Sequence, residues 1–152
     1  INDYFESQLQ DKTVALWGLS FKPGTDDIRE SSSRYLMEAL WDAGCNVRAY
    51  DPVAIKKARY LYGDRSDLTL CELAEDALEG ADALVIATGW REFLSPDFTM
   101  IKNSLKTSVI FDGRNLYDPQ KLRGLGIDYF AIGRSNVVER NVELQLIQAK
   151  VG

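Results

Sequence analysis

Short apolar runs alternate with amphipathic segments along this chain. The runs lack the polar alternation of a half-exposed strand, so they predict strands that are buried on both faces. The predicted strands are residues 13–17, 47–50, 83–87, 109–111 and 128–132. Helical spacing of apolar residues, often with a glycine behind it, predicts helices over residues 31–43, 54–62, 70–78 and 96–105.

This alternation favours an α/β fold in which helices cover both faces of a parallel sheet. We expect a three-layer α/β/α domain, Rossmann-like, with a mostly parallel sheet of about five strands, over residues 13–134. Residues 1–12 are polar and predict a helix or tail that enters from an upstream domain, and residues 135–152 predict a C-terminal extension. The first residue is Ile1 and not Met, which suggests a piece of a longer protein.

Composition narrows the classes of protein. The chain has 152 residues, of which 45% are hydrophobic and 27% charged, enough for a core without metal or disulfide support. It has no histidine, which excludes histidine-based catalysis and disfavours transition-metal sites. The apolar runs are too short to span a bilayer and no leader pattern opens the chain, so we expect no membrane association. Two cysteines, Cys45 and Cys71, form no disulfide framework, so we expect a cytoplasmic protein.

The formal net charge of −5 is unevenly spread. Residues 64–82 hold seven acidic side chains and one basic one, a pattern typical of a solvated helix face. No basic stripe is present, so we expect no nucleic-acid partner. A few local cations could still hold one small anionic ligand.

The loop after the first predicted strand carries the most candidate chemistry. Ligands of open parallel sheets bind beyond the carboxyl ends of the strands. Residues 18–33 there read GLSFKPGTDDIRESSS. Lys22 supplies a mobile cation, Pro23 and Gly24 shape the turn, and Thr25 and the serines supply hydroxyls before a helix start, where anions bind. These parts suit a phosphate or pyrophosphate, although a plain connection with a capping serine remains an alternative.

The same loop lacks both common glycine motifs. The dinucleotide fingerprint requires glycines where Ser20 and Pro23 stand, and the P-loop requires Lys-Ser/Thr after its last glycine. Asp26 and Asp27 are a weak metal signal. They are more typical of helix capping and of ion pairs with Arg29 or Arg34, and we expect no metal site.

Two later loops add candidates. Arg114 follows a predicted strand, and its planar fork of donors matches a phosphate or a base edge, the alternative being a surface salt bridge with Asp112 or Asp118. Trp90 and Phe93 are more typical of core or interface positions than of base stacking. Cys45 and Cys71 lack a neighbour that would lower their pKa and are expected to be inert.

Several motifs together resemble a known family. GLSFKPGTDDIRESSS, AYDPV (residues 49–53), ATGW (87–90), FDGRNLYDP (111–119) and residues 129–134 occur in the order found in the C-terminal, UDP-binding domain of the UDP-glucose/GDP-mannose dehydrogenase family. The resemblance extends over about residues 13–134. The pairing of TGWREF with FDGRN is most similar to the UDP-glucose 6-dehydrogenase branch.

The resemblance implies a function and a division of labour. Enzymes of that branch oxidise UDP-glucose to UDP-glucuronate with two NAD and water, and they are homo-oligomers. An upstream Rossmann domain would hold NAD and an upstream segment would supply the catalytic cysteine, so this chain would contain no catalytic residue and be inactive alone. Phe21, Lys22, Pro23, Gly24, Thr25 and Arg114 would bind the nucleotide sugar, and Arg29 would reach toward NAD.

Other functions stay open. The same domain occurs in GDP-mannose and UDP-N-acetylmannosamine dehydrogenases. A receiver-type signalling domain would share the α/β architecture, an acidic pair such as Asp26–Asp27, and a hydroxyl such as that of Thr88. It also needs an aspartate at the end of the third strand, where residues 87–88 are Ala-Thr. A stand-alone nucleotide-binding regulator would differ only in having no upstream polypeptide.

Overall fold

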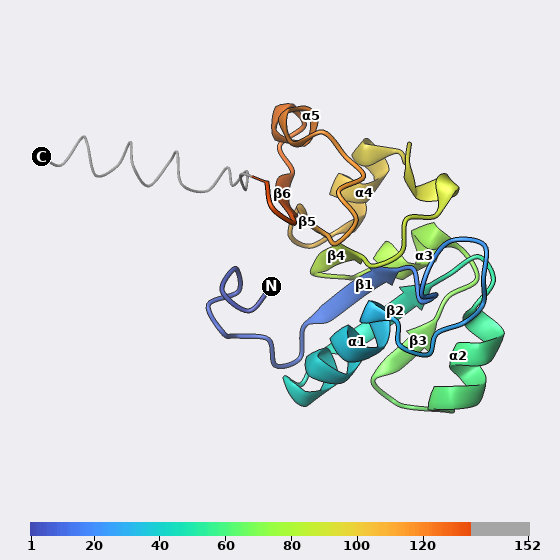
Figure 1. Ribbon diagram of the computed structural model, residues 1–152. Helices are drawn as coiled ribbons and strands as arrows, with labels where there is room; N and C mark the ends of the chain where they lie inside the picture. Colours follow the sequence, from blue (N-terminus) through green and yellow to red (C-terminus); the bar gives the residue numbers. More distant parts are fainter. Residues whose placement is uncertain (135–152) are drawn as a thin grey trace, which may run out of the picture.

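A computed structural model of the chain describes residues 1–134 (Figure 1). The strands are β1 (Thr13–Trp17), β2 (Asn46–Tyr50), β3 (Leu68–Leu70), β4 (Ala83–Ile86), β5 (Val109–Asp112) and β6 (Asp128–Ala131). The helices are α1 (Ser32–Asp42), α2 (Ile55–Tyr62), α3 (Ala74–Leu78), α4 (Phe98–Ser104) and α5 (Pro119–Gly124), with one 3₁₀ turn at Arg91–Phe93. The predicted extension at residues 135–152 lies outside the described residues.

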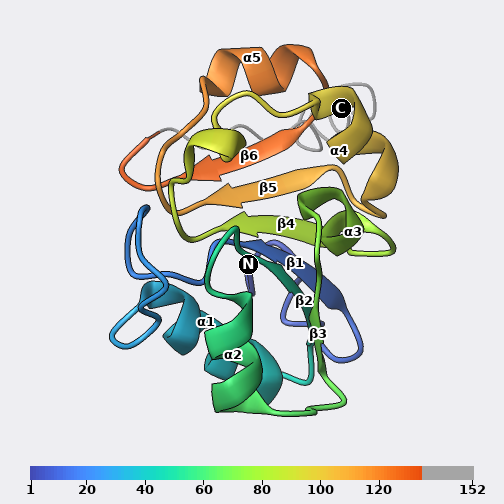
Figure 2. The ribbon, with the colours of Figure 1, turned by 90° about the vertical axis from the view of Figure 1, so that its right-hand side faces the viewer.

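In the described part of the chain the strands form one parallel sheet of six, in the order β3-β2-β1-β4-β5-β6 (Figure 2). This is the strand order of the doubly wound Rossmann fold. Helices lie on both faces, which confirms the predicted three-layer α/β/α architecture. The sheet has one strand more than the five expected.

The extra strand is β3, and it corrects one predicted helix. Residues 70–78 were expected to be helical, but Leu70 ends β3 and the helix occupies only Ala74–Leu78. The amide of Cys71 donates to the Ala49 carbonyl at 2.8 Å and extends the pairing with β2. Three residues at a sheet edge are too few to show a period, so the sequence hid this strand. The helix α5 was not predicted either, although Asp118 caps it and Pro119 begins it.

The core has two halves, one on each face of the sheet. On one face Trp17, Ile86 and Ile110 pack with residues of α3, α4 and α5. On the other face Leu16 and Val47 pack with residues of α1 and α2. Side chains of one strand alternate between the halves, which is why the strand sequences are apolar throughout.

Residues 1–12 form turns and pack against the sheet. The ring of Tyr4 meets those of Phe111 and Phe130 edge-on, with centroids 5.7 and 5.4 Å apart. Leu9 is buried among residues of the α1–α2 half of the core. Within residues 1–134, each helix is too short or too polar to cross a membrane.

Candidate functional site

The strand order reverses between β1 and β4, so the loops that leave these strands meet at the carboxyl edge of the sheet. The Thr88 hydroxyl, in the loop after β4, donates to the Ser20 carbonyl at 2.6 Å. Ser20 is 1% exposed and belongs to the loop after β1. Rossmann folds bind ligands at this reversal of strand order. The loop that carries the predicted site therefore starts at the expected place.

A buried carboxylate after β2 holds the start of that loop. Asp51 is 1% exposed, and its Oδ2 accepts hydrogen bonds from the Leu19 amide (2.8 Å), the Ser20 amide (3.1 Å) and the Ser20 hydroxyl (2.7 Å). The same oxygen accepts from Nε1 of Trp90 at 3.0 Å, which brings in the loop after β4. Trp90 is therefore an interior, partly buried residue, as the sequence suggested.

The other oxygen of Asp51 is also satisfied. Its Oδ1 accepts from the amides of Val53 and Ala54, both at 2.9 Å, at the start of α2. Burial on its own would raise the pKa of Asp51, but the hydrogen bonds from Leu19, Val53, Ser20 and Ala54 outweigh it and lower the pKa below its usual value. Asp51 is thus an anion inside the protein at neutral pH.

Arg114 joins the loop after β5 to the same place. Its Nε donates to the Ala87 carbonyl at 2.6 Å, and its Nη2 makes a long hydrogen bond of 3.5 Å to the Phe21 carbonyl. Its backbone amide donates to Asp112 at 2.8 Å. Within the described residues the alternative salt bridge of Arg114 with Asp112 or Asp118 is not formed. Arg114 therefore reaches across the carboxyl edge to the predicted loop.

Asp112 holds the loop after β5 by hydrogen bonds, as Asp51 holds the loop after β1. It is 2% exposed at the end of β5, and its Oδ2 accepts from the Leu116 amide and the Tyr129 hydroxyl, both at 2.7 Å. Two buried carboxylates thus fix the two loops that contain the predicted binding residues.

The tip of the β1 loop is open. Phe21, Lys22, Pro23 and Gly24 are exposed and Thr25 is half-buried. The Phe21 side chain is 52% exposed and lines an open pocket of about 370 Å³ with Asp27, Arg29 and Glu30. Within residues 1–134 the ammonium of Lys22 has no hydrogen-bond or ion-pair partner. An anchored base with a free apolar ring and a free cation at its tip is suited to contact a charged ligand.

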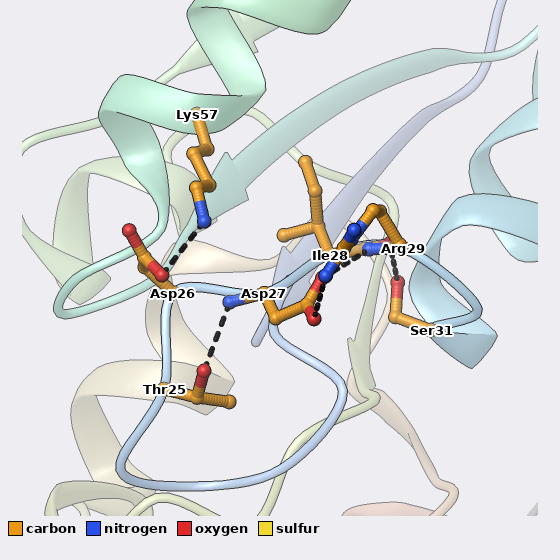
Figure 3. A network of polar contacts seen from close by, with 7 residues as sticks. All are labelled: Thr25, Asp26, Asp27, Ile28, Arg29, Ser31 and Lys57. Carbon is orange, nitrogen blue, oxygen red and sulfur yellow. Dashed lines mark hydrogen bonds and ion pairs between the residues drawn. The ribbon is translucent and has the colours of Figure 1, made fainter.

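The second half of the loop is held by ion pairs (Figure 3). Asp27 binds the guanidinium of Arg29 through both oxygens, at 3.1 and 3.0 Å, which confirms the predicted pairing. This hydrogen-bonded partner lowers the pKa of Asp27 to about 2. Asp26 pairs with Lys57 of α2 at 2.9 Å.

Two expectations about these acids were wrong. Neither Asp26 nor Asp27 caps α1, because Ser31 is the N-cap and its hydroxyl accepts from the Arg34 amide at 3.4 Å. Asp26 pairs with Lys57 and with neither arginine, since Arg29 pairs with Asp27 and Arg34 with Glu38 one turn along α1. The carboxylates hold the loop instead of the helix end. In the described residues, no group of three or more potential metal ligands occurs.

Sequence reasoning missed Asp51, Asp112 and Thr88 as residues that build the site, and Lys57 as a tether. In the sequence, Asp51 stands out only as part of the AYDPV motif. A signal was present, because an aspartate that follows a buried strand and precedes proline stands at the same edge as the ligand loops.

The two cysteines are buried in the core and take no part in this site. Cys45 and Cys71 are 1% and 5% exposed, and burial raises the pKa of both thiols.

Comparison with known proteins gives a family. Residues 15–119 match the family described as UDP-glucose/GDP-mannose dehydrogenase family, UDP binding domain. A UDP-glucose 6-dehydrogenase of Pseudomonas aeruginosa is 47% identical over 137 residues, which are 88% of this chain and 30% of that protein. UDP-glucose 6-dehydrogenase YwqF of Bacillus subtilis is 37% identical over 84% of this chain and 28% of its own length.

Solved structures agree with the sequence matches. A UDP-glucose dehydrogenase of Pyrobaculum islandicum superposes with a TM-score of 0.71 at 30% identity, over 88% of this chain and 28% of that one. A UDP-D-ManNAc dehydrogenase of Pyrococcus horikoshii has a TM-score of 0.68 at 32% identity, over 88% and 30%. The chain thus spans about three tenths of the length of these relatives. It belongs to the UDP-glucose/GDP-mannose dehydrogenase family and corresponds to the UDP-binding domain of that family.

Proposed function

We propose that this chain is the nucleotide-sugar-binding domain of an NAD-dependent UDP-glucose 6-dehydrogenase, in which Phe21, Lys22, Pro23, Gly24, Thr25 and Arg114 bind UDP-glucose. The observation that carries the proposal is the hydrogen bond from Arg114 to the Phe21 carbonyl. It joins two segments that lie 93 positions apart and that the sequence singled out separately. The 47% identity to a UDP-glucose 6-dehydrogenase supports the choice of ligand.

The chemistry of the loop suits a diphosphate. UDP-glucose carries two negative charges on adjacent phosphates, and a mobile ammonium with a planar guanidinium is a fitting pair of partners. Lys22 has no partner within the described residues. Arg114 uses Nε and one Nη2 contact inside the protein and has further donors to offer. The exposed ring of Phe21 supplies an apolar surface beside them.

The redox step requires parts that this chain does not offer in usable form. Oxidation of the primary alcohol to a carboxylate takes one water, reduces two NAD to NADH and releases three protons. The family's route requires a thiol nucleophile and a nearby hydride acceptor. Both thiols of this chain are buried with raised pKa values. We therefore assign the nucleophile to polypeptide outside this chain.

The described residues do not fit a complete NAD site. The dinucleotide fingerprint is absent, and the Leu19 and Ser20 amides that begin the β1 loop are bound to Asp51, so they are not available to a pyrophosphate. We propose that NAD is bound by polypeptide outside this chain and that Arg29 is the one residue of this chain that contacts it. That contact requires the guanidinium to turn from Asp27, which is feasible because the Arg29 side chain is 79% exposed.

Further assignments rest on the family and on composition. We propose that the parent enzyme is cytoplasmic and homo-oligomeric and uses neither nucleic acid nor membrane as a partner. The neighbouring solved structures include a UDP-D-ManNAc dehydrogenase at 32% identity, so a related UDP-sugar is the second candidate ligand. The receiver alternative fits poorly, because receivers have the strand order 2-1-3-4-5. Here Asp26 and Asp27 are also engaged with Lys57 and Arg29.

Calorimetric titration of the chain with UDP-glucose, UDP, UDP-N-acetylmannosamine and GDP-mannose tests the proposal. We expect weak binding of UDP and UDP-glucose and a further loss with Lys22→Ala. Lys106→Ala is the matched control, since Lys106 is exposed before β5 at the opposite edge of the sheet. Equal binding of UDP by Lys22→Ala and the wild-type chain would overturn the site, and preference for GDP-mannose would overturn the ligand.

A further inference from the structure

We propose that Asp51 is the positioning residue of this site: its buried carboxylate fixes the Phe21–Thr25 loop for the nucleotide sugar by holding the residues just before it. The inference rests on the proposed function, because it concerns how the same loop is made competent to bind. Asp51 itself touches no ligand in this scheme. It acts through Leu19, Ser20 and Trp90.

The geometry around Asp51 brings three loops to one group. Its six hydrogen bonds come from the loop after β1, from the loop after β4, and from the start of α2. All six partners are N–H or O–H donors, so both side-chain positions of residue 51 must be hydrogen-bond acceptors. An ionised carboxylate has only acceptors, whereas an amide would turn an NH₂ toward donors on one side. The site therefore selects a carboxylate by its hydrogen bonding.

Ser20 transmits this order to the loop tip. Asp51 holds its amide and hydroxyl, and Thr88 donates to its carbonyl. Ser20 is 1% exposed, whereas the next residue, Phe21, is 52% exposed. The chain thus passes from a buried side chain to an exposed one in a single step. Asp51 and Thr88 thus fix the backbone position from which Phe21 and Lys22 leave the sheet.

Asp51 also binds the backbone amides that face a ligand in other Rossmann domains. In dinucleotide-binding Rossmann domains the first-loop amides face a pyrophosphate, and an acidic residue farther along binds the ribose. Here the first-loop amides and the acid after β2 bind each other. The contact closes the usual dinucleotide position and stiffens the base of the loop, which leaves the tip as the part that can meet a ligand.

Asp51→Asn in the chain is the test, read by hydrogen exchange of residues 19–25 and by UDP-glucose titration. We expect faster exchange in these residues, unchanged protection in β5 and β6, and UDP-glucose binding weakened about tenfold or more, the equivalent of one lost charge-assisted hydrogen bond. Leu122→Ala is the control. It opens a cavity under α5, away from the loop, and should lower stability without changing exchange at residues 19–25 or affinity.

The outcomes separate the inference from the function. Unchanged exchange and unchanged affinity in Asp51→Asn would overturn the inference, as would an equal loss of affinity in Leu122→Ala. If the wild-type chain binds no UDP-sugar, the proposed function fails, whereas the exchange result still decides whether Asp51 orders the loop. Should Asp51→Asn not fold, Ser20→Ala removes one donor to the same oxygen, and a few-fold weaker binding is then expected.

Discussion

Gly18 and Thr88 approach so closely where β1 and β4 end that a Cβ on Gly18 would lie 2.5 Å from the Cβ of Thr88. Gly18 also has a φ of +95°, a conformation that side chains with a Cβ rarely adopt. The two constraints act on one residue at the start of the candidate site. Only glycine lets the two loops meet here, and the Thr88–Ser20 hydrogen bond depends on that approach.

Gly18→Ala should therefore destabilise the chain by about 2–4 kcal/mol, since overpacking and a positive φ add together. The midpoint of urea unfolding measures the change. Gly124→Ala is the matched control, because the residue ends α5 and a Cβ there would meet no atom within 4 Å beyond its chain neighbours and the backbone of its own helix. It should leave stability the same or slightly higher. Equal midpoints for the two variants would contradict the steric argument.

Arg114 offers a prediction that separates its charge from its shape. Arg114→Lys keeps the positive charge and loses the fork that reaches both the Ala87 and Phe21 carbonyls. We expect Arg114→Lys to lose about 1 kcal/mol of stability and most of the UDP-glucose affinity that Arg114→Ala loses. Titration calorimetry and urea unfolding measure both. Arg123→Ala is the control, because Arg123 is an exposed arginine on α5. If Arg114→Lys keeps the wild-type affinity, the positive charge alone is enough for binding UDP-glucose.

Much of the fold could be predicted from the sequence because its buried parallel strands are continuous apolar runs. β1, β4 and β5 stand out for that reason. β3 does not, because it is a three-residue edge strand whose central Thr69 is exposed. The helix α5 was missed because its six residues include only one that is buried, Leu122.

The candidate site was predictable only as far as residue types reveal chemistry. The loop after β1 was predicted because glycine, proline and a lysine are concentrated in it. Arg114 was predicted because an arginine follows a buried strand. Asp51 did not, because its role depends on donors from positions 19, 20 and 90, which the fold brings together and the sequence does not. The partners of Asp26 and Asp27 were half predictable: Arg29 is local, whereas Lys57 comes from a helix 31 residues away.

The Asp27–Arg29 pair predicts a pH dependence. The pKa of Asp27 lies at about 2 in the folded chain, below its ordinary 3.8, because of the hydrogen bonds and charge of Arg29. The pair therefore contributes stability above pH 3.8, and that contribution is lost as the pH falls through about 2. The effect is small and sensitive to salt because both groups face solvent.

Arg29→Ala should return the pKa of Asp27 toward 3.8, which a carboxyl-carbon NMR titration measures. Arg34→Ala is the control, since Arg34 pairs with Glu38 and should leave Asp27 unchanged. The backbone amide of residue 29 also donates to Asp27 and remains in this variant, so the return should be partial. A pKa that stays near 2 in Arg29→Ala would show that the guanidinium does not hold the carboxylate. If NAD draws Arg29 away in the parent enzyme, the same rise should follow NAD addition.

The two thiols give the last prediction, which concerns catalysis. Cys45 and Cys71 are buried and burial raises the pKa of each, so the thiolate that would attack an aldehyde is scarce at neutral pH. The first hydride transfer needs no thiol, but the described residues form no complete NAD site, because the Leu19 and Ser20 amides are bound to Asp51. The chain with UDP-glucose and NAD should therefore form no NADH, measured by absorbance at 340 nm. Reaction of the native thiols with a disulfide reagent should be slow and become fast and complete in urea.

The double variant Cys45→Ala/Cys71→Ala is the control and should bind UDP-glucose as the wild type does. NADH formation that this double variant abolishes would show that the nucleophile lies in this chain after all.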